Sequence, residues 1–356
     1  MRNVHVDLGP KSYDIEIEKG LLYHVGSKVR RLLPKAEKIA VITDSNVGPL
    51  YASILRDALA KEGFTVTVLT FKAGEERKNL KTLGNLYDGL AEAGLTRSDA
   101  VIALGGGVTG DMGGLAAATF LRGVAFIQIP TSLLATVDSS VGGKVAIDLP
   151  SGKNLVGAFY QPRAVYIDPD LLQTLPVRYL HDGLAEVVKY GCIRDKELFQ
   201  MLEKIQNDTE LLENADIIIE ICCNIKARIV EQDEFDTGER MLLNFGHTLG
   251  HAVEKSFCFD RYSHGEGVGI GMVLLTRQSE KLGFTEPGTA DKIAGLLHKF
   301  QLPVTVAMRQ EDFLQAISLD KKKRGSSITL ILLKKIGESV LQKVEFGELK
   351  RYIPEK

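Results

Sequence analysis

The feature of this sequence that most constrains its fold is a change of pattern about halfway along the chain. Up to about residue 170, short apolar runs alternate with amphipathic helical runs. Buried strands are predicted at residues 38–43 (KIAVIT), 64–71 (FTVTVLTF), 100–104 (AVIAL) and 124–129 (VAFIQI). The helical segments 49–62 and 77–93 each stop before a glycine. Such alternation predicts a mostly parallel sheet covered by helices.

Beyond about residue 171, long helical segments follow one another instead. Helices are expected at residues 177–190, 196–205, 215–231, 239–257, 267–282 and 290–300. A clear strand returns near residues 328–333 (ITLILL). The chain has 356 residues, more than one hydrophobic core usually organises. We therefore predict an α/β domain over residues 1–172 and a mainly helical domain over residues 173–356.

The composition excludes two classes of partner. The formal net charge is −2, so no basic surplus favours nucleic acid or an anionic membrane surface. No apolar run is long enough to span a bilayer, and the first residues lack a signal-peptide core. The 4 cysteines show no disulfide or CxxC spacing, so reduced and mostly buried thiols are expected. We expect a cytoplasmic protein.

A glycine-rich segment at residues 103–114 (ALGGGVTGDMGG) follows one predicted strand and opens a helix. Gly105, Gly107 and Gly110 satisfy G-x-G-x-x-G, in which backbone N–H groups approach a pyrophosphate at the positive end of a helix. The motif follows a later strand than usual, and no convincing acidic ribose partner stands at the usual distance after it. Alone, the loop fits a nucleotide site or a tight structural turn. Asp111 either caps the helix or contacts a hydroxyl.

A second dense segment, residues 130–159, combines small hydroxyl residues, glycines and two lysines. This composition suits anionic ligands. Taken alone, either Lys144 or Lys153 is more typical of a solvated loop.

Three of the 7 histidines fall within residues 244–267. His247 and His251 are four apart in a helical segment, so both imidazoles project from one face, and His264 follows after a break. Imidazoles with a carboxylate suit Zn²⁺, which in catalytic sites takes three protein ligands and keeps an open position. The spacing does not choose the ligands, because residue 248 is Thr rather than the HExxH glutamate and Glu186 is one of 46 acidic residues.

Several ordered blocks resemble the 3-dehydroquinate synthase family. They are GEERK (74–78), GGGVTGDMGGLAAATFLRG, IPTSLLATVDSSVGGK, GKNLVGAF, LPVRYLHDGLAEVVKYG, NFGHTLGHAVE, HGEGVGIGM and DKKKRG (320–325). The resemblance implies a Rossmann-like nucleotide-binding α/β domain followed by a mainly helical metal-binding domain. It implies conversion of 3-deoxy-D-arabino-heptulosonate 7-phosphate to 3-dehydroquinate and phosphate, a step of the shikimate route to aromatic amino acids. Transient oxidation, elimination, reduction and aldol closure would use NAD⁺ and Zn²⁺ or Co²⁺.

Carried over by position, the metal ligands would be Glu186, His247 and His264, whereas His251 would take part in proton transfer beside the substrate. The other residues expected at the substrate are Asp138, Lys144, Asn154, Lys189, Lys226, Arg240 and Asn244, of which Asn154, Arg240 and Asn244 would hold phosphate. Either Lys321 or Lys322 would join them. Arg122 would reach the phosphate bound by a neighbouring subunit, which implies a homodimer.

The residues expected to contact NAD⁺ are Asp44, Gly74, Glu75, Lys78, Gly106, Gly107, Asp111, Thr131, Ser132, Lys144, Lys153, Leu171 and Thr174. The substrate's own phosphate would serve as base in the elimination, which accounts for the lack of an obvious protein base. Thr136 stands where Gln is common and Asp148 where Asn is common, and neither is among these contacts. A single-function enzyme is implied.

Three alternatives compete with this reading. A related cyclase would act on sedoheptulose 7-phosphate or glucose 6-phosphate. A polyol dehydrogenase of similar fold would release NADH, and the expected phosphate-binding residues argue against it. A non-catalytic relic would have lost turnover, and the complete set of metal and pocket residues argues against that.

Overall fold

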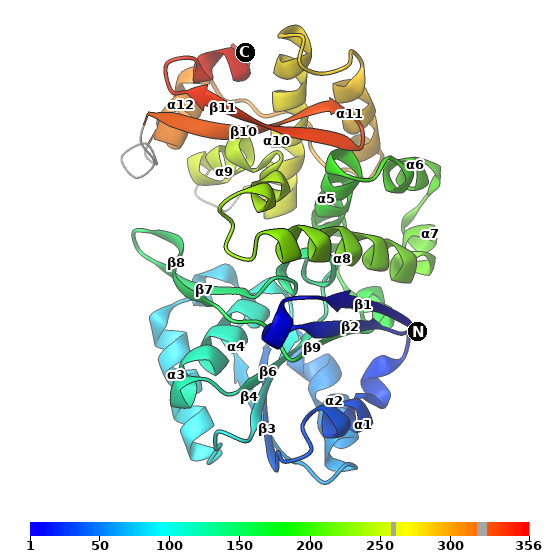
Figure 1. The fold of residues 1–356 in the computed structure, drawn as a ribbon, viewed down its shortest axis with the longest axis vertical. Coiled ribbons are helices and arrows are strands. Elements are labelled where there is room, and N and C mark those ends of the chain that lie inside the picture. The colour runs from blue at the N-terminus through cyan, green and yellow to red at the C-terminus, as the bar shows by residue number, and fades with distance from the viewer. Residues whose placement is uncertain (258–260, 319–325, 356) are drawn as a thin grey trace. The chain divides into compact units, whose positions relative to one another are not determined.

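The computed structural model describes residues 1–257, 261–318 and 326–355 (Figure 1). It divides into two compact units, the first formed by Met1–Leu175 with Asn214–Glu231 and the second by Pro176–Glu213 with Gln232–Lys356. The units therefore interleave along the chain, whereas the sequence analysis expected one boundary after residue 172.

Helix α8 (Ala215–Gln232) groups with unit 1 because its side chains are tied to residues far away in the sequence. Arg2 bonds Asp216 at 2.8 Å and Glu220 at 2.5 Å, and the Cys223 thiol donates to the Thr136 carbonyl at 3.3 Å. These contacts join α8 to the first strand and to the loop after the sixth.

Unit 1 is built on a seven-stranded sheet. In spatial order its strands are β1 (Arg2–Val6), β2 (Tyr13–Ile17), β9 (Ala164–Ile167), β6 (Ala125–Pro130), β5 (Ala100–Gly105), β3 (Lys38–Asp44) and β4 (Thr65–Phe71). The β1–β2 pair is antiparallel and every other pairing is parallel. The predicted α/β fold class is thus confirmed. Strand order reverses between β3 and β5, where ligands bind at the carboxyl edge of such sheets.

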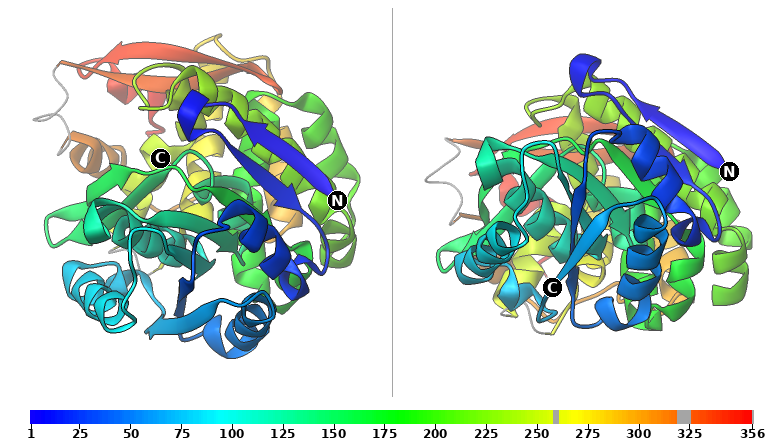
Figure 2. Two further views of the ribbon diagram at one scale, coloured as in Figure 1. Left: turned by 60° about the horizontal axis from the view of Figure 1, so that its bottom comes forward. Right: turned by 90° about the horizontal axis from the view of Figure 1, so that it is seen from below.

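Helices cover both faces of this sheet (Figure 1, Figure 2). They are α1 (Val25–Leu32), α2 (Gly48–Ala60), α3 (Leu80–Glu92) and α4 (Gly107–Thr119). Alternate strand residues enter different cores, as the two-residue period of a strand requires. Ile39, Val41 and Ile102 pack with apolar residues of α1 and α2. Ala40 and Ile42 pack with those of α3 and α4.

The segment 130–159, in which the sequence analysis named no helix or strand after residue 130, contains a π-helical turn and an antiparallel hairpin. The turn is Ala135–Ser139, and the hairpin is β7 (Lys144–Leu149) with β8 (Gly152–Phe159). Val145 and Ile147 of β7 pack in the same core as apolar residues of α3 and α4. Burial of these side chains therefore favours a strand, although the glycines in the segment interrupt the strand pattern in the sequence.

Unit 2 is mainly helical, as predicted. Its helices are α5 (Val177–Ile193), α6 (Lys196–Lys204), α7 (Asp208–Glu213), α9 (His247–Ser256), α10 (His264–Lys281), α11 (Thr289–Lys299) and α12 (Gln310–Ser318). The strand expected near residue 330 is β10 (Ser327–Lys335), which pairs with β11 (Glu338–Glu345), a strand the sequence analysis missed. Apolar residues of α9, α10, β10 and the C-terminal turn share one core.

The helix expected over residues 239–257 is interrupted. A 3₁₀ turn, Glu239–Asn244, ends before Phe245, and α9 begins at His247 after Gly246. Gly246 has φ +81°, a left-handed conformation that costs glycine little and other residues much. The break makes His247 the first residue of a new helix.

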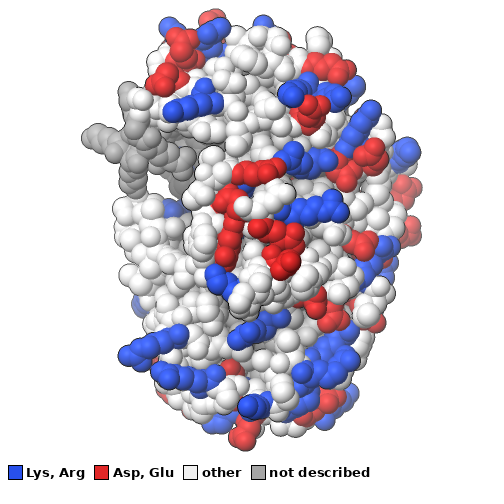
Figure 3. Space-filling view, in the orientation of Figure 1, with Lys and Arg blue, Asp and Glu red and all other residues white. Residues whose placement is uncertain are grey.

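Charged side chains of both signs are interspersed over the face shown in Figure 3. Within the described ranges, no helix combines the length and apolarity of a membrane span.

Candidate active site

The glycine motif forms a turn between the end of β5 at Gly105 and the start of α4 at Gly107, as its spacing predicts. Close packing accounts for two of the glycines in this turn. A Cβ at Gly105 would lie 2.5 Å from Thr109 Oγ1, and one at Gly107 would lie 3.2 Å from the Ser139 hydroxyl. The N–H groups at the start of α4 point out of the helix, where they could donate to an anion at the place where strand order reverses.

An acidic residue lies at the neighbouring strand end. Asp44 ends β3, which pairs directly with β5. Its carboxylate accepts hydrogen bonds from the Thr109 hydroxyl at 3.0 Å and from the N–H groups of Asn46 and Val47 at 2.8 and 3.1 Å. The family resemblance named Asp44 among the residues expected at NAD⁺, whereas the search for an acidic residue after the glycine motif did not find it because Asp44 precedes the motif.

Lys78 lies between Asp111 and Asn154. Its Nζ is 2.5 Å from Asp111 Oδ2 and donates to Asn154 Oδ1 at 2.6 Å. Burial raises the pKa of Asp111 to about 6, although the charge of Lys78 opposes the rise. Burial lowers the pKa of Lys78, but the charges of Asp111 and Glu75 outweigh that effect and the net pKa is raised. Asp111 therefore pairs with Lys78 and does not cap α4, whose N-cap residue is Gly106.

Other residues expected at NAD⁺ lie in unit 1 as three groups. Lys153 Nζ is 3.4 Å from Glu75 Oε1, and Gly74 precedes them with φ +125°. The Tyr51 hydroxyl is 2.5 Å from Thr174 Oγ1 and donates to the Leu171 carbonyl at 3.3 Å. At the glycine turn, the Thr131 N–H donates to Gly105 O at 3.0 Å and Ser132 Oγ accepts from Ala135 N–H at 3.3 Å.

Two of the expected substrate residues meet in unit 1. Asp138 lies on the π-helical turn, and Lys226 on α8 donates to the Asp138 carbonyl at 2.6 Å and to its carboxylate. Lys144 begins β7 and is exposed. Asn154, in β8, has φ +54° and its N–H donates to Asp148 Oδ1 at 2.7 Å. The departure at Asp148 therefore supports a residue of the predicted site.

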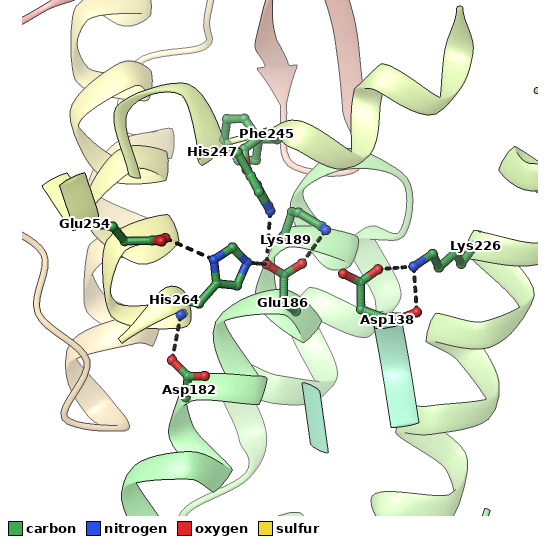
Figure 4. Close-up of polar contacts among 10 residues, drawn as sticks. Asp138, Asp182, Glu186, Lys189, Lys226, Phe245, His247, Glu254 and His264 are labelled. Carbon is green, nitrogen blue, oxygen red and sulfur yellow. Dashed lines mark hydrogen bonds and ion pairs between the residues drawn. The ribbon is translucent and has the colours of Figure 1, made fainter. Parts of the chain in front are cut away.

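In unit 2 the structure brings Glu186, His247 and His264 together from α5, α9 and α10 (Figure 4). Glu186 Oε1 is 3.4 Å from His247 Nε2 and 3.5 Å from His264 Nε2. Bonds of about 2.0–2.1 Å in tetrahedral geometry place two donor atoms roughly 3.3 Å apart. The separations thus match the edges of a zinc coordination polyhedron, and one carboxylate with two imidazoles is a donor set that Zn²⁺ and Co²⁺ accept.

Both ring orientations suit a metal. His247 Nδ1 lies 3.1 Å from the Phe245 carbonyl oxygen, and His264 Nδ1 lies 3.0 Å from Glu254 Oε1. An oxygen acceptor at Nδ1 keeps the proton there and leaves the lone pair of Nε2 available. In both rings this is the nitrogen that faces Glu186.

The pKa values of the two histidines move in opposite directions. Burial lowers the pKa of His247 to about 3, with help from the charge of Lys189, so the ring is neutral at physiological pH. Burial also disfavours the charge on His264, but hydrogen bonds and charges of Glu186 and Glu254 outweigh it and raise its pKa well above the ordinary value.

A second group, His251 with Glu254 and His264, also lies close enough to share an ion. His251 is exposed, and its ring centroid is 5.3 Å from that of His247. Glu254 was missed in the sequence, although it continues the face of His247 and His251 at i+7. Asp182 was missed too. It lies four residues before Glu186 and accepts the Gly265 N–H at 2.6 Å.

Four glycines set the approach of α9 to α10. A Cβ at Gly271 would lie 2.0 Å from the Gly246 carbonyl oxygen, and one at Gly250 would lie 2.9 Å from the Gly267 carbonyl carbon. The contact is formed by Gly246, the N-cap residue of α9, with Gly250 four residues later, and by Gly267 and Gly271 on α10. The close approach explains why one helix can place His247 beside His264 on the other.

The remaining predicted residues are distributed over both units. In unit 2, Lys189 is buried and forms an ion pair with Glu186, one turn away on α5. Arg240 is buried and donates to the Glu234 carbonyl at 2.6 Å, and Asn244 ends the same 3₁₀ turn. In unit 1, Arg122 is exposed on a turn of left-handed residues. The lysines at 321 and 322 lie outside the described residues.

Together, the glycine turn on an α/β sheet and the His₂Glu group in a helical unit define a class of enzyme that pairs a nucleotide with a divalent metal. Comparison with known families narrows this class. Residues 68–182 match the model of the 3-dehydroquinate synthase N-terminal domain, and residues 183–323 match that of the C-terminal domain. The 3-dehydroquinate synthase of Clostridium acetobutylicum is 51% identical over 354 residues, covering 99% of both chains.

Solved structures that are less similar in sequence agree with this assignment. A 2-deoxy-scyllo-inosose synthase complexed with carbaglucose-6-phosphate, NAD⁺ and Co²⁺ matches with TM-score 0.88 and 26% identity over 98% of both chains. A 2-epi-5-epi-valiolone synthase of Streptomyces hygroscopicus with NAD⁺ and Zn²⁺ bound matches with TM-score 0.85 and 26% identity, covering 96% of this chain and 95% of that one. The chain belongs to the 3-dehydroquinate synthase family.

Proposed function

We propose that this chain is a 3-dehydroquinate synthase, a carbon–oxygen lyase that converts 3-deoxy-D-arabino-heptulosonate 7-phosphate to 3-dehydroquinate and phosphate. The observation that carries the proposal is the group formed by Glu186, His247 and His264, whose separations suit a divalent metal. The 51% identity to a relative of that name supports this substrate over those of the cyclases at 26%.

In the proposed chemistry, Glu186, His247 and His264 would hold Zn²⁺ or Co²⁺, which would supply a Lewis acid for the substrate hydroxyls, and bound NAD⁺ would supply a reversible hydride acceptor. Unit 1 would bind the dinucleotide. Amide N–H groups at Gly106 and Gly107 would donate to the pyrophosphate, and Asp44 and Asp111 would accept from ribose hydroxyls. The order of β3 and β5 at the strand reversal supports this placement.

The chain's charged residues would hold the substrate. Arg240 would donate through its guanidinium to the phosphate, and Asn154 and Asn244 would donate from their amide nitrogens. The ammonium groups of Lys144, Lys189 and Lys226 and the carboxylate of Asp138 would orient the rest of the molecule. His251 would move a proton at the reacting end through its ring nitrogens. Lys189 and Arg240 are both buried, although lysine and arginine are mostly exposed in folded proteins, and this burial supports these roles.

The proposal also includes a homodimer in which Arg122 reaches the phosphate held by the other subunit. Leu121 and Arg122 both have positive φ, at 50° and 67°, and both side chains are exposed. Strained turns of this kind are common at functional sites. A cytoplasmic location is part of the proposal and is supported by Cys192, Cys222 and Cys223, which are buried and form no disulfide.

The decisive test is release of phosphate from 3-deoxy-D-arabino-heptulosonate 7-phosphate with Zn²⁺ and substoichiometric NAD⁺. Many turnovers per NAD⁺, formation of dehydroquinate and arrest by a chelator are expected. No release by folded, metal-loaded protein would contradict the proposal, and sedoheptulose 7-phosphate would then be assayed to test the related cyclase activity. Accumulation of NADH in step with product would identify a polyol dehydrogenase instead.

A further inference from the structure

Glu254 is a buried carboxylate with no part in the function proposed above. It lies on α9, and 5% of its side chain is exposed. Within residues 1–257, 261–318 and 326–355, the polar partner of its carboxylate is His264, whose Nδ1 is 3.0 Å from Glu254 Oε1. Burying a charge is costly unless it is paired, so this single contact requires an explanation.

The contact acts on a ring whose other nitrogen faces Glu186. Figure 4 shows the His264 imidazole between the two carboxylates, with Nδ1 directed to Glu254 and Nε2 to Glu186. A carboxylate at Nδ1 accepts an N–H, so the proton stays on that nitrogen and Nε2 keeps its lone pair. The negative charge also increases electron density on the imidazole, which strengthens its bond to a cation.

The backbone of His264 is held separately. The following residue, Gly265, donates its N–H to Asp182 at 2.6 Å, and a Cβ at Gly265 would lie 2.0 Å from the Asp182 carbonyl oxygen. Asp182 therefore places the start of α10 against α5, while the rotation of the ring about its side-chain bonds is left to Glu254. At Nδ1 of His247 the acceptor is the neutral carbonyl of Phe245. Of the two histidines, His264 is thus the one whose Nδ1 contacts a charged group, Glu254.

We propose that Glu254 is a positioning residue for the metal site: by accepting the Nδ1–H of His264, it fixes the ring orientation and tautomer in which Nε2 binds the ion. The inference rests on the proposed assignment of Glu186, His247 and His264 as ligands. It differs from a role for Glu254 as a ligand in the second group, with His251 and His264, in which its carboxylate itself would bind the ion.

The test measures zinc affinity of the full chain by competition with a chromophoric chelator. Loss of such outer partners typically weakens metal binding about 10–100-fold. We expect Glu254→Gln, which keeps an acceptor but not the charge, to bind about 10-fold more weakly, and Glu254→Ala to approach the upper limit. Both variants should still bind one ion per chain, and the visible spectrum of their cobalt forms should shift.

Glu280→Gln is the matched control. This residue lies on α10, where its carboxylate accepts the Ala290 N–H at 2.7 Å, and the variant should bind zinc like the parent protein. Equal zinc affinity in the parent and both Glu254 variants would overturn the inference, as would an equal loss in Glu280→Gln. Loss of the ion from both Glu254→Gln and His251→Ala would make Glu254 a ligand and would also overturn it.

Failure of the underlying proposal would look different. If the unmutated chain bound no zinc, the assignment of the metal site itself would fall, whatever the variants did. If Glu254→Ala did not fold, the circular dichroism of the metal-free protein would show it, and the comparison of Glu254→Gln with the parent would decide. A purely structural role would lower the metal-free unfolding midpoint and leave the zinc affinity and the cobalt spectrum unchanged.

Discussion

At the scale of single residues, the histidine cluster shows how little spacing says about roles. His247 and His251 are equivalent in the sequence as an i, i+4 pair, yet His247 is buried and His251 is exposed. His247 faces Glu186 at 3.4 Å, whereas His251 belongs only to the second group of potential ligands. The difference arises from the position of α9 against α5 and α10, which no local pattern encodes.

The first prediction separates these two histidines. Because His247 should be a ligand, His247→Ala should lose bound zinc, and activity with it. Because His251 should move a proton, His251→Ala should retain about one zinc per chain and turn over roughly 10²–10⁴-fold more slowly. Zinc content by atomic emission and phosphate release measure the two effects. Comparable zinc loss in both variants would refute the division of roles.

A second residue-scale prediction concerns the pH dependence of NAD⁺ binding. Burial raises the pKa of Asp111 to about 6 in the free protein. A ribose hydroxyl donates better to the ionised carboxylate, so bound NAD⁺ would lower that pKa. Below pH 6 the Asp111 carboxyl of the free protein is therefore mostly protonated, and NAD⁺ must displace that proton to bind. The dissociation constant of NAD⁺ should then increase by up to about tenfold for each pH unit below pH 6.

Calorimetric titration of NAD⁺ between pH 5 and 8 measures this effect. Asp111→Asn removes the titrating group, so its dissociation constant should change much less over the same range. A flat profile in the unmutated protein would contradict the role given to Asp111. Calorimetry is the suitable method because the chain has no tryptophan to report binding by fluorescence.

At the scale of elements, the contact between α9 and α10 determines whether the metal ligands meet. Gly271→Ala would place a methyl group in collision with the Gly246 carbonyl oxygen, since the ideal Cβ is only 2.0 Å from that oxygen. The helices must then separate. We expect a loss of roughly 1–3 kcal/mol in the free energy of unfolding, together with weaker zinc binding.

Gly295→Ala is the control for that prediction. Gly295 lies in α11, and its Cβ would meet nothing within 4 Å. Alanine at an open helical position stabilises by up to about 1 kcal/mol. Urea unfolding followed by circular dichroism, with zinc content measured in parallel, compares the two variants. Unchanged stability and zinc affinity in Gly271→Ala would show that the close helix contact is dispensable.

The helices and strands with a regular apolar repeat were predicted well. The elements that depend on burial against distant residues were not. The strands β3 to β6 and helix α8 were located to within a few residues because their apolar runs repeat regularly. The β7–β8 hairpin was missed because glycines and polar residues interrupt its pattern, and the core contacts of Val145 and Ile147 stabilise it. The break at Gly246 was missed because the residues on both sides favour a helix, and only the tertiary contact demands φ +81°.

At the scale of the whole molecule, the proposed dimer would complete each phosphate site with Arg122 from the other subunit. Mixed dimers test this sharing. Arg122→Ala and Lys189→Ala should each be nearly inactive as homodimers, because each lacks one contact to the substrate. After subunit exchange, a mixed dimer would carry one site with both residues intact, and at most about a quarter of the parent activity should return.

Phosphate release before and after exchange measures the recovery, with exchange itself verified by mass spectrometry. A mixture of Lys189→Ala with Lys226→Ala is the control, since both residues are proposed to serve the site of their own subunit and no intact site can form. No recovery with Arg122→Ala despite proven exchange would count against a shared site.

The sequence by itself determined the α/β sheet, the helical second half, the glycine turn and the family, because these depend on local periodicity and on motifs in a fixed order. The tertiary structure decided which distant residues contact those motifs. Asp44 joins the glycine turn because β3 pairs with β5, and α8 groups with unit 1 through Arg2, Asp216 and Glu220. Glu186, Glu254 and His264 converge because three helices pack closely, and such long-range contacts depend on burial rather than on the order of residues.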